Sequence, residues 1–397
     1  MKIVKILWFL AIPVLLYYGL YTGRREFFVL FFMLSVVPLY GFVLNVWTLM
    51  SFSFVQELSE PQAVKGSTPR LNIRIHNEKP FPLSTMQIQL QTVMLSDDYA
   101  LRFDLPPQSG IAFSVPVHCG YRGVYAVGMT TMRFHDIFGL VKSTFDMRSL
   151  PYYRQRTLKI YPRQVLLPFL PACTVDAKHE SLRALHKAEE GETFSDLRRF
   201  QPGDGLKRVH RVASARRREL LVKTYDIPME TTALIAIDAT KIPAIGEEDA
   251  LLLADLACEC AGAVIRYSLQ AGFAVHMLEN DPRKPVLEGR GIQDFPQFYE
   301  ALTVMDFESA DSLLTRLEHA VYNMPQLRTV TLITARPVTE LTPLLARLAR
   351  EGCGVKVLAL SRYREALGQN PVGMYGVGWA PIAVGDELET VLLQPVQ

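Results

Sequence analysis

The chain has 397 residues, which at roughly 150 residues per domain suggests two or three domains. Its 42 Lys and Arg residues nearly balance its 40 Asp and Glu residues, so the bulk charge implies no strongly basic or acidic partner. Hydrophobic residues make up 49% and charged residues 21% of the chain, which excludes a disordered protein. The five cysteines are scattered along the chain and favour a reducing compartment over a disulfide framework.

Two apolar stretches at the start of the chain predict a pair of transmembrane helices. Residues 6–23 carry no charge, and residues 27–50 are almost entirely apolar or aromatic. About 20 apolar residues in a helix span the hydrocarbon core of a bilayer. A cleaved signal peptide is the alternative for the first stretch, but residues 17–21 are bulky where a cleavage site needs small side chains. We therefore assign residues 1–56 to a transmembrane hairpin.

The charges around the hairpin predict its orientation. Two spans return the chain to its starting side, so the N-terminus and residues 57–397 share one compartment. Basic residues on that side outnumber those of the turn: Lys2, Lys5, Lys65, Arg70 and Arg74 against Arg24 and Arg25. Because cytoplasmic flanks carry the excess of Lys and Arg, we expect a two-span protein of the cell membrane with its bulk in the cytoplasm.

Residues 57–163 are predicted to form a β-sandwich-like domain. Residues 72–76 and 87–91 alternate polar and apolar side chains, as half-buried antiparallel strands do. Further strand-like runs are residues 100–105, 111–117, 123–128, 132–135 and 158–161. Strands at this spacing, separated by Pro and Gly turns, indicate a small immunoglobulin-like sandwich. No group of residues in this domain has catalytic spacing.

Residues 164–230 form a predicted linker that contains a dense basic run at residues 207–218. Arg198, Asp204 and Arg208 could bond to one another and lock the connection between two domains. The same residues, with Arg216, could instead contact a partner protein, because arginine pairs well with acidic groups. Binding of a small anion or nucleic acid by residues 207–218 is a third interpretation, but few aromatic side chains are interleaved for base stacking. We expect no nucleic-acid partner.

Residues 231–397 alternate strand and helix patterns. Apolar strand-like runs lie at residues 233–237, 273–278, 330–334 and 355–360. Helical patterns lie between them at residues 248–270, 309–322 and 340–350. Repeated strand–helix units predict an α/β doubly wound, mostly parallel sheet. In such sheets, ligands bind at the carboxyl ends of the strands.

Two motifs resemble domain-of-unknown-function family 58. The longer one includes Gly191, Phe194, Leu197, Arg198, Phe200, Gly203, Asp204, Arg208, Val209, His210, Ala213, Ser214, Ala215, Arg216, Leu220, Val222 and Lys223. The shorter one joins Arg122-Gly123-Val124-Tyr125 to Asp136-Ile137-Phe138-Gly139-Leu140. The resemblance implies a von Willebrand factor A-like fold for residues 231–397. It also implies a MoxR-type AAA+ ATPase as partner.

That fold resemblance further implies a divalent cation held by an Asp-x-Ser-x-Ser motif and a distant acid. Here Asp238 and Thr240 match the motif, but its third ligand position is Ile242. The later strand ends in Thr334-Ala335-Arg336-Pro337, without the acid. A hard cation needs several oxygen ligands, so we expect a degenerate metal site that does not function, and no cofactor. Asp238 could instead cap the following turn or pair with a basic group.

The resulting hypothesis is a membrane-anchored interaction or adaptor protein without catalytic activity of its own. Its docking or domain-locking residues would be Arg198, Asp204, Arg208 and Arg216. One alternative is a metal-assisted hydrolase centred on Asp238. Another is anion or nucleic-acid binding through residues 207–218. The chain has no G-x-x-x-x-G-K-[ST] motif, so any nucleotide-driven step would need a partner.

Overall fold

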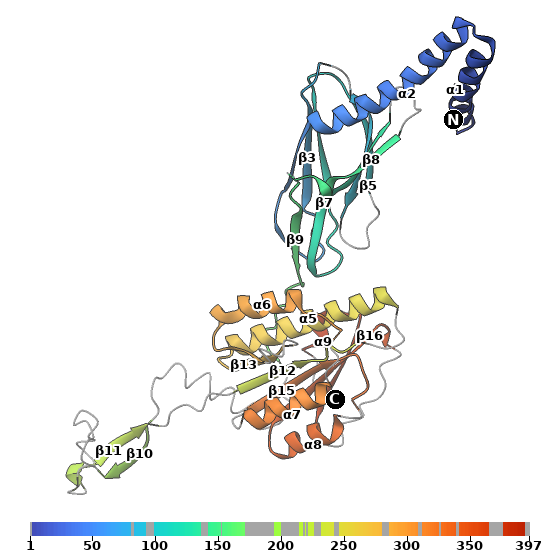
Figure 1. The fold of residues 1–397 in the computed structure, drawn as a ribbon. Coiled ribbons are helices and arrows are strands. Elements are labelled where there is room, and N and C mark those ends of the chain that lie inside the picture. Colours follow the sequence, from blue (N-terminus) through green and yellow to red (C-terminus); the bar gives the residue numbers. More distant parts are fainter. Residues whose placement is uncertain are drawn as a thin grey trace. The chain divides into compact units, whose positions relative to one another are not determined.

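The computed structural model of the full chain divides into two compact units, Met1–Tyr161 and Pro162–Gln397 (Figure 1). The boundary between the units lies two residues before residue 163, where the sequence predicts the end of the β-rich domain. The structure describes residues 2–80, 83–92, 99–135, 142–151, 153–170, 194–199, 214–216, 219, 221–225, 232–241, 246–279, 286–308, 312–324, 327–338, 341–364 and 376–393.

The first unit begins with two apolar helices, α1 (Lys2–Thr22) and α2 (Arg25–Ser51). The turn between them is tight, because Gly23 has a φ of +64° and its N–H bonds the carbonyl of Gly19 at 3.0 Å. Lys5–Thr22 and Arg25–Trp47 are long and apolar enough to cross a membrane, and few of their residues are buried by the protein itself. The expected helical hairpin is present.

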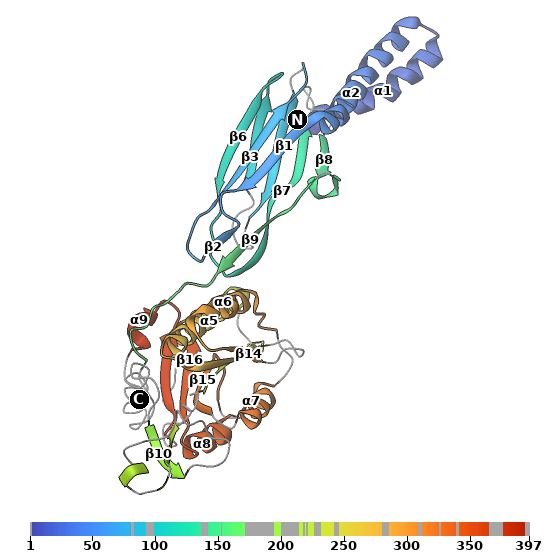
Figure 2. The ribbon, with the colours of Figure 1, turned by 90° about the vertical axis from the view of Figure 1, so that its left-hand side faces the viewer.

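Strand β1 (Phe52–Leu58) follows α2 without a linker. The sequence assigns residues 52–56 to the hairpin, and this boundary is wrong, because pairing with β3 (Arg70–Asn77) already begins at Phe52 opposite Asn77. Strand β6 (Gly110–Pro116) pairs with the other side of β3 and completes an antiparallel sheet in the order β1-β3-β6 (Figure 2).

The second sheet of this unit has the order β2-β9-β7-β4-β5, with β8 also paired to β7. Its strands are β2 (Gln62–Val64), β4 (Leu83–Gln91), β5 (Tyr99–Leu105), β7 (Gly123–His135), β8 (Lys142–Asp146) and β9 (Arg156–Tyr161). A short helix, η1 (Met147–Ser149), follows β8. The sequence splits β7 at Gly128, but the glycine accommodates a φ of +148° inside one continuous strand.

The two sheets share one hydrophobic core. The sheet containing β3 contributes Leu71, Ile73 and Ile75, and the other contributes side chains that include Met86, Ile88, Leu90, Met129, Met132 and Phe134. The buried residues of β3 alternate with exposed ones, as expected of a strand with one face toward a core. The predicted arrangement of two sheets around a core is therefore observed, although the sequence analysis missed β1, β2 and β8.

The second unit contains a separate pair of strands, β10 (Phe194–Arg199) and β11 (Leu221–Tyr225), that pair antiparallel with each other. Its main sheet has the order β14-β13-β12-β15-β16-β17. These strands are β12 (Thr232–Ile237), β13 (Ala274–Leu278), β14 (Val286–Gly289), β15 (Leu327–Thr334), β16 (Gly354–Ser361) and β17 (Gly378–Ala383). All neighbours run parallel except β13 and β14.

Helices cover both faces of this sheet, with α5 and α6 on one side and α7 and α8 on the other (Figure 1). The helices are α5 (Glu247–Gln270), α6 (Phe295–Val304), α7 (Leu313–Asn323), α8 (Thr342–Arg350) and α9 (Leu388–Val391), with a short η3 (Ile292–Asp294) before α6. Every residue of β12 is buried. Ile235 and Ile237 pack in the core that contains α5, whereas Leu234 and Ala236 pack in the core that contains α7 and α8.

The predicted α/β architecture is therefore present, and four elements were missed. Helix α6 lies in a stretch that the sequence analysis took as irregular, and β14, β17 and α9 had no strong pattern. Edge strands such as β14 and β17 contact the core less completely than β12, which weakens their apolar signal.

Gln56 connects the two sheets of the first unit. Its side chain is 4% exposed. The amide nitrogen Nε2 donates to the Arg154 carbonyl at 2.8 Å, and Oε1 accepts from the Met129 backbone N–H at 3.1 Å. A Cβ atom on Gly128 would lie 2.8 Å from Gln56 Oε1, so glycine leaves the space that this side chain occupies. Strand β1, and with it the end of α2, is thereby fixed to β7.

We expect Gln56→Ala to destabilise the first unit by about 2–4 kcal/mol, because it leaves a backbone donor and an acceptor without their bonds. Glu57→Ala is the matched control, since Glu57 is the exposed neighbour on the same strand. The measurement is thermal unfolding of the full chain in detergent, followed by circular dichroism. Equal melting temperatures for the two variants would contradict this role of Gln56.

Candidate functional site

The parallel pairing of β12 with β15 brings two polar strand ends together. Ile237 lies opposite Ile333, and the Asp238 N–H donates to the Ile333 carbonyl at 2.8 Å. The chain therefore places Asp238 and Thr334 side by side at the carboxyl edge of the sheet. This edge is the usual ligand position in open α/β sheets, so it is the first place to look for a site.

Both carboxylate oxygens of Asp238 accept hydrogen bonds from the protein. Oδ1 accepts from the Thr240 hydroxyl at 2.5 Å and from the Thr240 N–H at 3.3 Å. Oδ2 accepts from the Thr334 hydroxyl at 2.8 Å. The side chains of Thr240 and Thr334 belong to residues that are 8% and 2% exposed. Asp238 thus closes the turn that follows β12 and joins it to the end of β15.

Arg336 completes this network from the exposed side. Its guanidinium Nη1 donates to the Thr240 hydroxyl oxygen at 2.5 Å, and its backbone N–H donates to the Thr334 hydroxyl oxygen at 3.0 Å. Arg336 itself is exposed. We define Asp238, Thr240, Thr334 and Arg336 as the strand-end network. The sequence predicts that Asp238 could cap the turn after its strand, and its bonds from Thr240 confirm this; the bond from Arg336 to Thr240 was not predicted.

The strand-end network does not fit the divalent cation that the family resemblance implies. It offers one carboxylate, and that carboxylate already accepts bonds from two hydroxyl groups. The Thr240 oxygen, the second expected ligand, lies 2.5 Å from a guanidinium nitrogen. A hard cation needs six or more oxygen ligands whose lone pairs are available to it, and a neighbouring positive charge repels it. These four residues therefore form a hydrogen-bonded structural network rather than a set of metal ligands.

The predicted basic residues are only partly placed. Arg198 lies on β10 in register with Val222 of β11. Arg216 lies in a short helical turn at residues 214–216 and is exposed. Asp204 and Arg208 lie outside the described residues, as does most of the basic run at residues 207–218.

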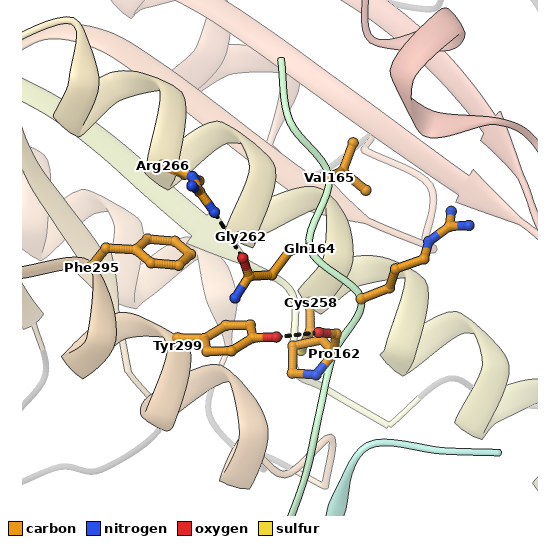
Figure 3. Close-up of a pocket in the computed structure, with 9 residues that line it drawn as sticks. Pro162, Gln164, Val165, Cys258, Gly262, Arg266, Phe295 and Tyr299 are labelled. Atoms are coloured by element: carbon orange, nitrogen blue, oxygen red, sulfur yellow. Dashed lines mark hydrogen bonds between the residues drawn. The ribbon is translucent and has the colours of Figure 1, made fainter. Parts of the chain in front are cut away.

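A different set of residues holds the start of the second unit, at residues 162–170, against helices α5 and α6 (Figure 3). The Tyr299 hydroxyl donates to the Pro162 carbonyl at 2.5 Å, and Arg266 Nη1 donates to Gln164 Oε1 at 2.7 Å. Val165 and Leu167 enter the core beneath this segment. The depression that these residues line has an empty volume of about 210 Å³ and no enclosed space of a water molecule's size. It is a packing contact.

This contact was not predicted, because the helix that carries Tyr299 was itself missed and no motif links Arg266 or Tyr299 to residues 162–164.

The described cysteines are not organised for catalysis. Cys119, Cys258, Cys260 and Cys353 are all buried. Burial raises the pKa of the Cys260 thiol, and the nearby Glu259 raises it further, so this thiol is not a ready nucleophile. Among the described residues, no group of three or more His, Cys, Asp and Glu side chains could hold a metal ion.

Comparison with known proteins gives one distant relative. No family model matches the chain. The uncharacterized protein YeaD of Bacillus subtilis (strain 168) is 21% identical over 362 residues, which cover 88% of this chain and 85% of that protein. Among solved structures, the b-glucosidase EmGH1 from Erythrobacter marinus matches 28% of this chain and 15% of its own, with 7% identity and a TM-score of 0.18. This structural likeness is too partial to support an argument about function.

The strand-end network predicts how the protein responds to divalent cations. We expect isothermal titration with Mg²⁺ or Mn²⁺ to give no saturable heat, because Arg336 already bonds the Thr240 oxygen. We also expect Asp238→Ala to lower the free energy of unfolding by about 1–3 kcal/mol, since two hydroxyl groups lose their acceptor. Saturable heat that disappears in Asp238→Ala would contradict this interpretation and restore the metal site.

Proposed function

We propose that this chain is a membrane-anchored interaction protein of the family 58 type, without catalytic activity of its own. Its α/β unit is a von Willebrand factor A-like domain that lies in the cytoplasm and docks a partner protein. The observation that carries the proposal is the strand-end network, in which the expected metal ligands bond to one another and to Arg336. Such a site can recognise an acidic group but lacks the ligands of a metal-assisted hydrolase.

Arg336 is the proposed docking point. One guanidinium nitrogen is fixed by Thr240, which restrains the orientation of the planar fork, and the side chain is exposed at the strand ends. The neighbouring Lys241 is also exposed and adds positive charge. A restrained arginine bonds a carboxylate in a bidentate manner at a lower entropic cost than a free one. The favoured ligand is therefore an acidic side chain of a partner.

The membrane anchor supports the same function. Helix α2 ends at Ser51 and β1 begins at Phe52, so the first unit is attached to the hairpin without a flexible linker. If the hairpin crosses a membrane, this attachment holds the β-sheets next to it. The family resemblance implies a MoxR-type AAA+ ATPase as the partner, and we propose Arg198, Asp204, Arg208 and Arg216 as a second contact for it.

Co-purification from native membranes in mild detergent, with and without ATP, tests the docking proposal. We expect the tagged protein to enrich an AAA+ ATPase, identified by mass spectrometry, and Arg336→Glu to reduce its recovery at least about tenfold, the effect of one charge-assisted contact replaced by repulsion. Arg328→Glu is the matched control. Arg328 is also an exposed arginine, but it lies at the opposite end of β15.

Equal loss in both variants would show that Arg336 is no specific contact. Recovery of the protein alone from wild-type membranes in every condition would contradict the partner assignment. If an Arg198→Ala, Asp204→Ala double variant recovers less ATPase but keeps a normal circular dichroism spectrum, the second contact includes these residues. A changed spectrum would instead show that these residues are needed for folding.

A further inference from the structure

The sheet β1-β3-β6 carries a groove on its outward face. The groove has a volume of about 310 Å³ and is lined by Ser53, Phe54, Val55, Arg74, Ile75, His76, Gly110, Ile111 and Ala112. The central strand β3 supplies the long polar side chains, and the flanking strands supply mostly short ones. In register, Arg74 lies between Val55 and Ala112, and His76 lies between Ser53 and Gly110.

The shape of the groove depends on Gly110. A Cβ atom at this position would lie 3.0 Å from His76 Nδ1. Any other residue would therefore press on the imidazole and narrow the groove at this end. The glycine keeps the row formed by Ser53, His76 and Gly110 open.

The charge in the groove is positive. Arg74 and His76 are exposed, and the cross-strand neighbours of Arg74 are apolar. Among the described residues, Arg74 makes no ion pair with an acidic side chain. Glu57 stands one row further along the sheet, opposite Asn72, and Glu78 follows β3. The groove thus combines a guanidinium without an internal acid and an apolar wall formed by the exposed neighbours of Arg74, Val55 and Ala112.

This end of the sheet adjoins the apolar hairpin. Ser53 is two residues beyond the end of α2, which limits their separation to about 7 Å. The last turns of α2 also contact the sheets: Asn45 Nδ2 donates to Ser143 Oγ at 3.3 Å, and the Lys79 amine lies 4.7 Å from the centre of the Trp47 ring. Trp is favoured at the membrane interface, so a membrane crossed by the hairpin would bring its headgroups to this end of the sheet.

We propose that this groove binds the headgroup of an anionic phospholipid, with the phosphate on Arg74 and the glycerol portion against the apolar wall. The inference rests on the hairpin crossing a membrane and is independent of docking at Arg336. An exposed guanidinium bonds a phosphate through two parallel N–H groups. A lipid bound in this way orients the β-rich unit on the membrane surface.

Native mass spectrometry of the full chain in detergent tests the proposal with phosphatidylglycerol and phosphatidylcholine of matched acyl chains. We expect the wild-type chain to retain phosphatidylglycerol preferentially and Arg74→Gln to weaken that retention about tenfold, the effect of one charge-assisted bidentate contact. Ala112→Leu should weaken it as well, because it fills the groove without changing the charge. Arg70→Gln is the matched control, since Arg70 is an exposed arginine on the same face at the other end of β3.

Three outcomes would overturn the proposal. Retention by Arg74→Gln equal to that of the wild-type chain would mean that the hairpin alone holds the lipid. Equal losses in Arg74→Gln and Arg70→Gln would mean that binding follows net charge rather than the groove. Full displacement of phosphatidylglycerol by inorganic phosphate would identify a site for the free anion. None of these results bears on Arg336, so the two proposals fail separately.

Discussion

The parallel pairing of β12 with β15 is the interaction on which the α/β unit depends. Both strands are buried on two faces, and their register sets which residues emerge together at the carboxyl edge. Asp238 and Thr334 are separated by 96 residues in the chain, yet their side chains bond at 2.8 Å because the strands align Ile237 with Ile333. A change in this register would separate the polar groups and leave the partly buried Asp238 carboxylate without these donors.

The strand-end network joins the turn after β12 to the end of β15 through side chains alone. Thr240 both donates to Asp238 and accepts from Arg336, so the hydroxyl group links the negative and the positive side chain. Both carboxylate oxygens of Asp238 accept bonds within the network, and the remaining guanidinium donors belong to an exposed residue. The proposed recognition of an external acidic group rests on this exposed guanidinium.

The first unit obeys a comparable constraint at its attachment to the hairpin. Gln56 bonds across to β7 and β1 continues directly from α2, so the apolar helices and the two sheets are joined through one short stretch of chain. Few residues are available there to absorb movement. The proposed lipid groove includes Ser53 and Val55 of β1, the strand that also carries Gln56. A lipid bound there would therefore contact the strand that links the sheets to α2.

Local patterns predicted the two long apolar helices and the strands whose burial is complete or strictly alternating. The uninterrupted apolar stretches of α1 and α2, the alternation in β3 and the apolar run of β12 are each visible in a short window of sequence. Edge strands such as β2, β8, β14 and β17 were missed because half-exposed strands carry weak patterns. The boundary after α2 was also missed, since an apolar strand directly after an apolar helix gives no change in hydrophobicity.

The apolar hairpin, the β-rich part, the α/β part and the residue types at the end of β12 can all be recognised in the amino-acid sequence. The folded chain alone reveals that Arg336 bonds Thr240, that Gln56 bonds Met129 and that Tyr299 bonds Pro162. These partners are 96, 73 and 137 residues apart. The physical reason is that hydrophobic periodicity specifies which face of an element is buried, whereas strand order and register specify which polar groups meet, and no short stretch of sequence contains both partners.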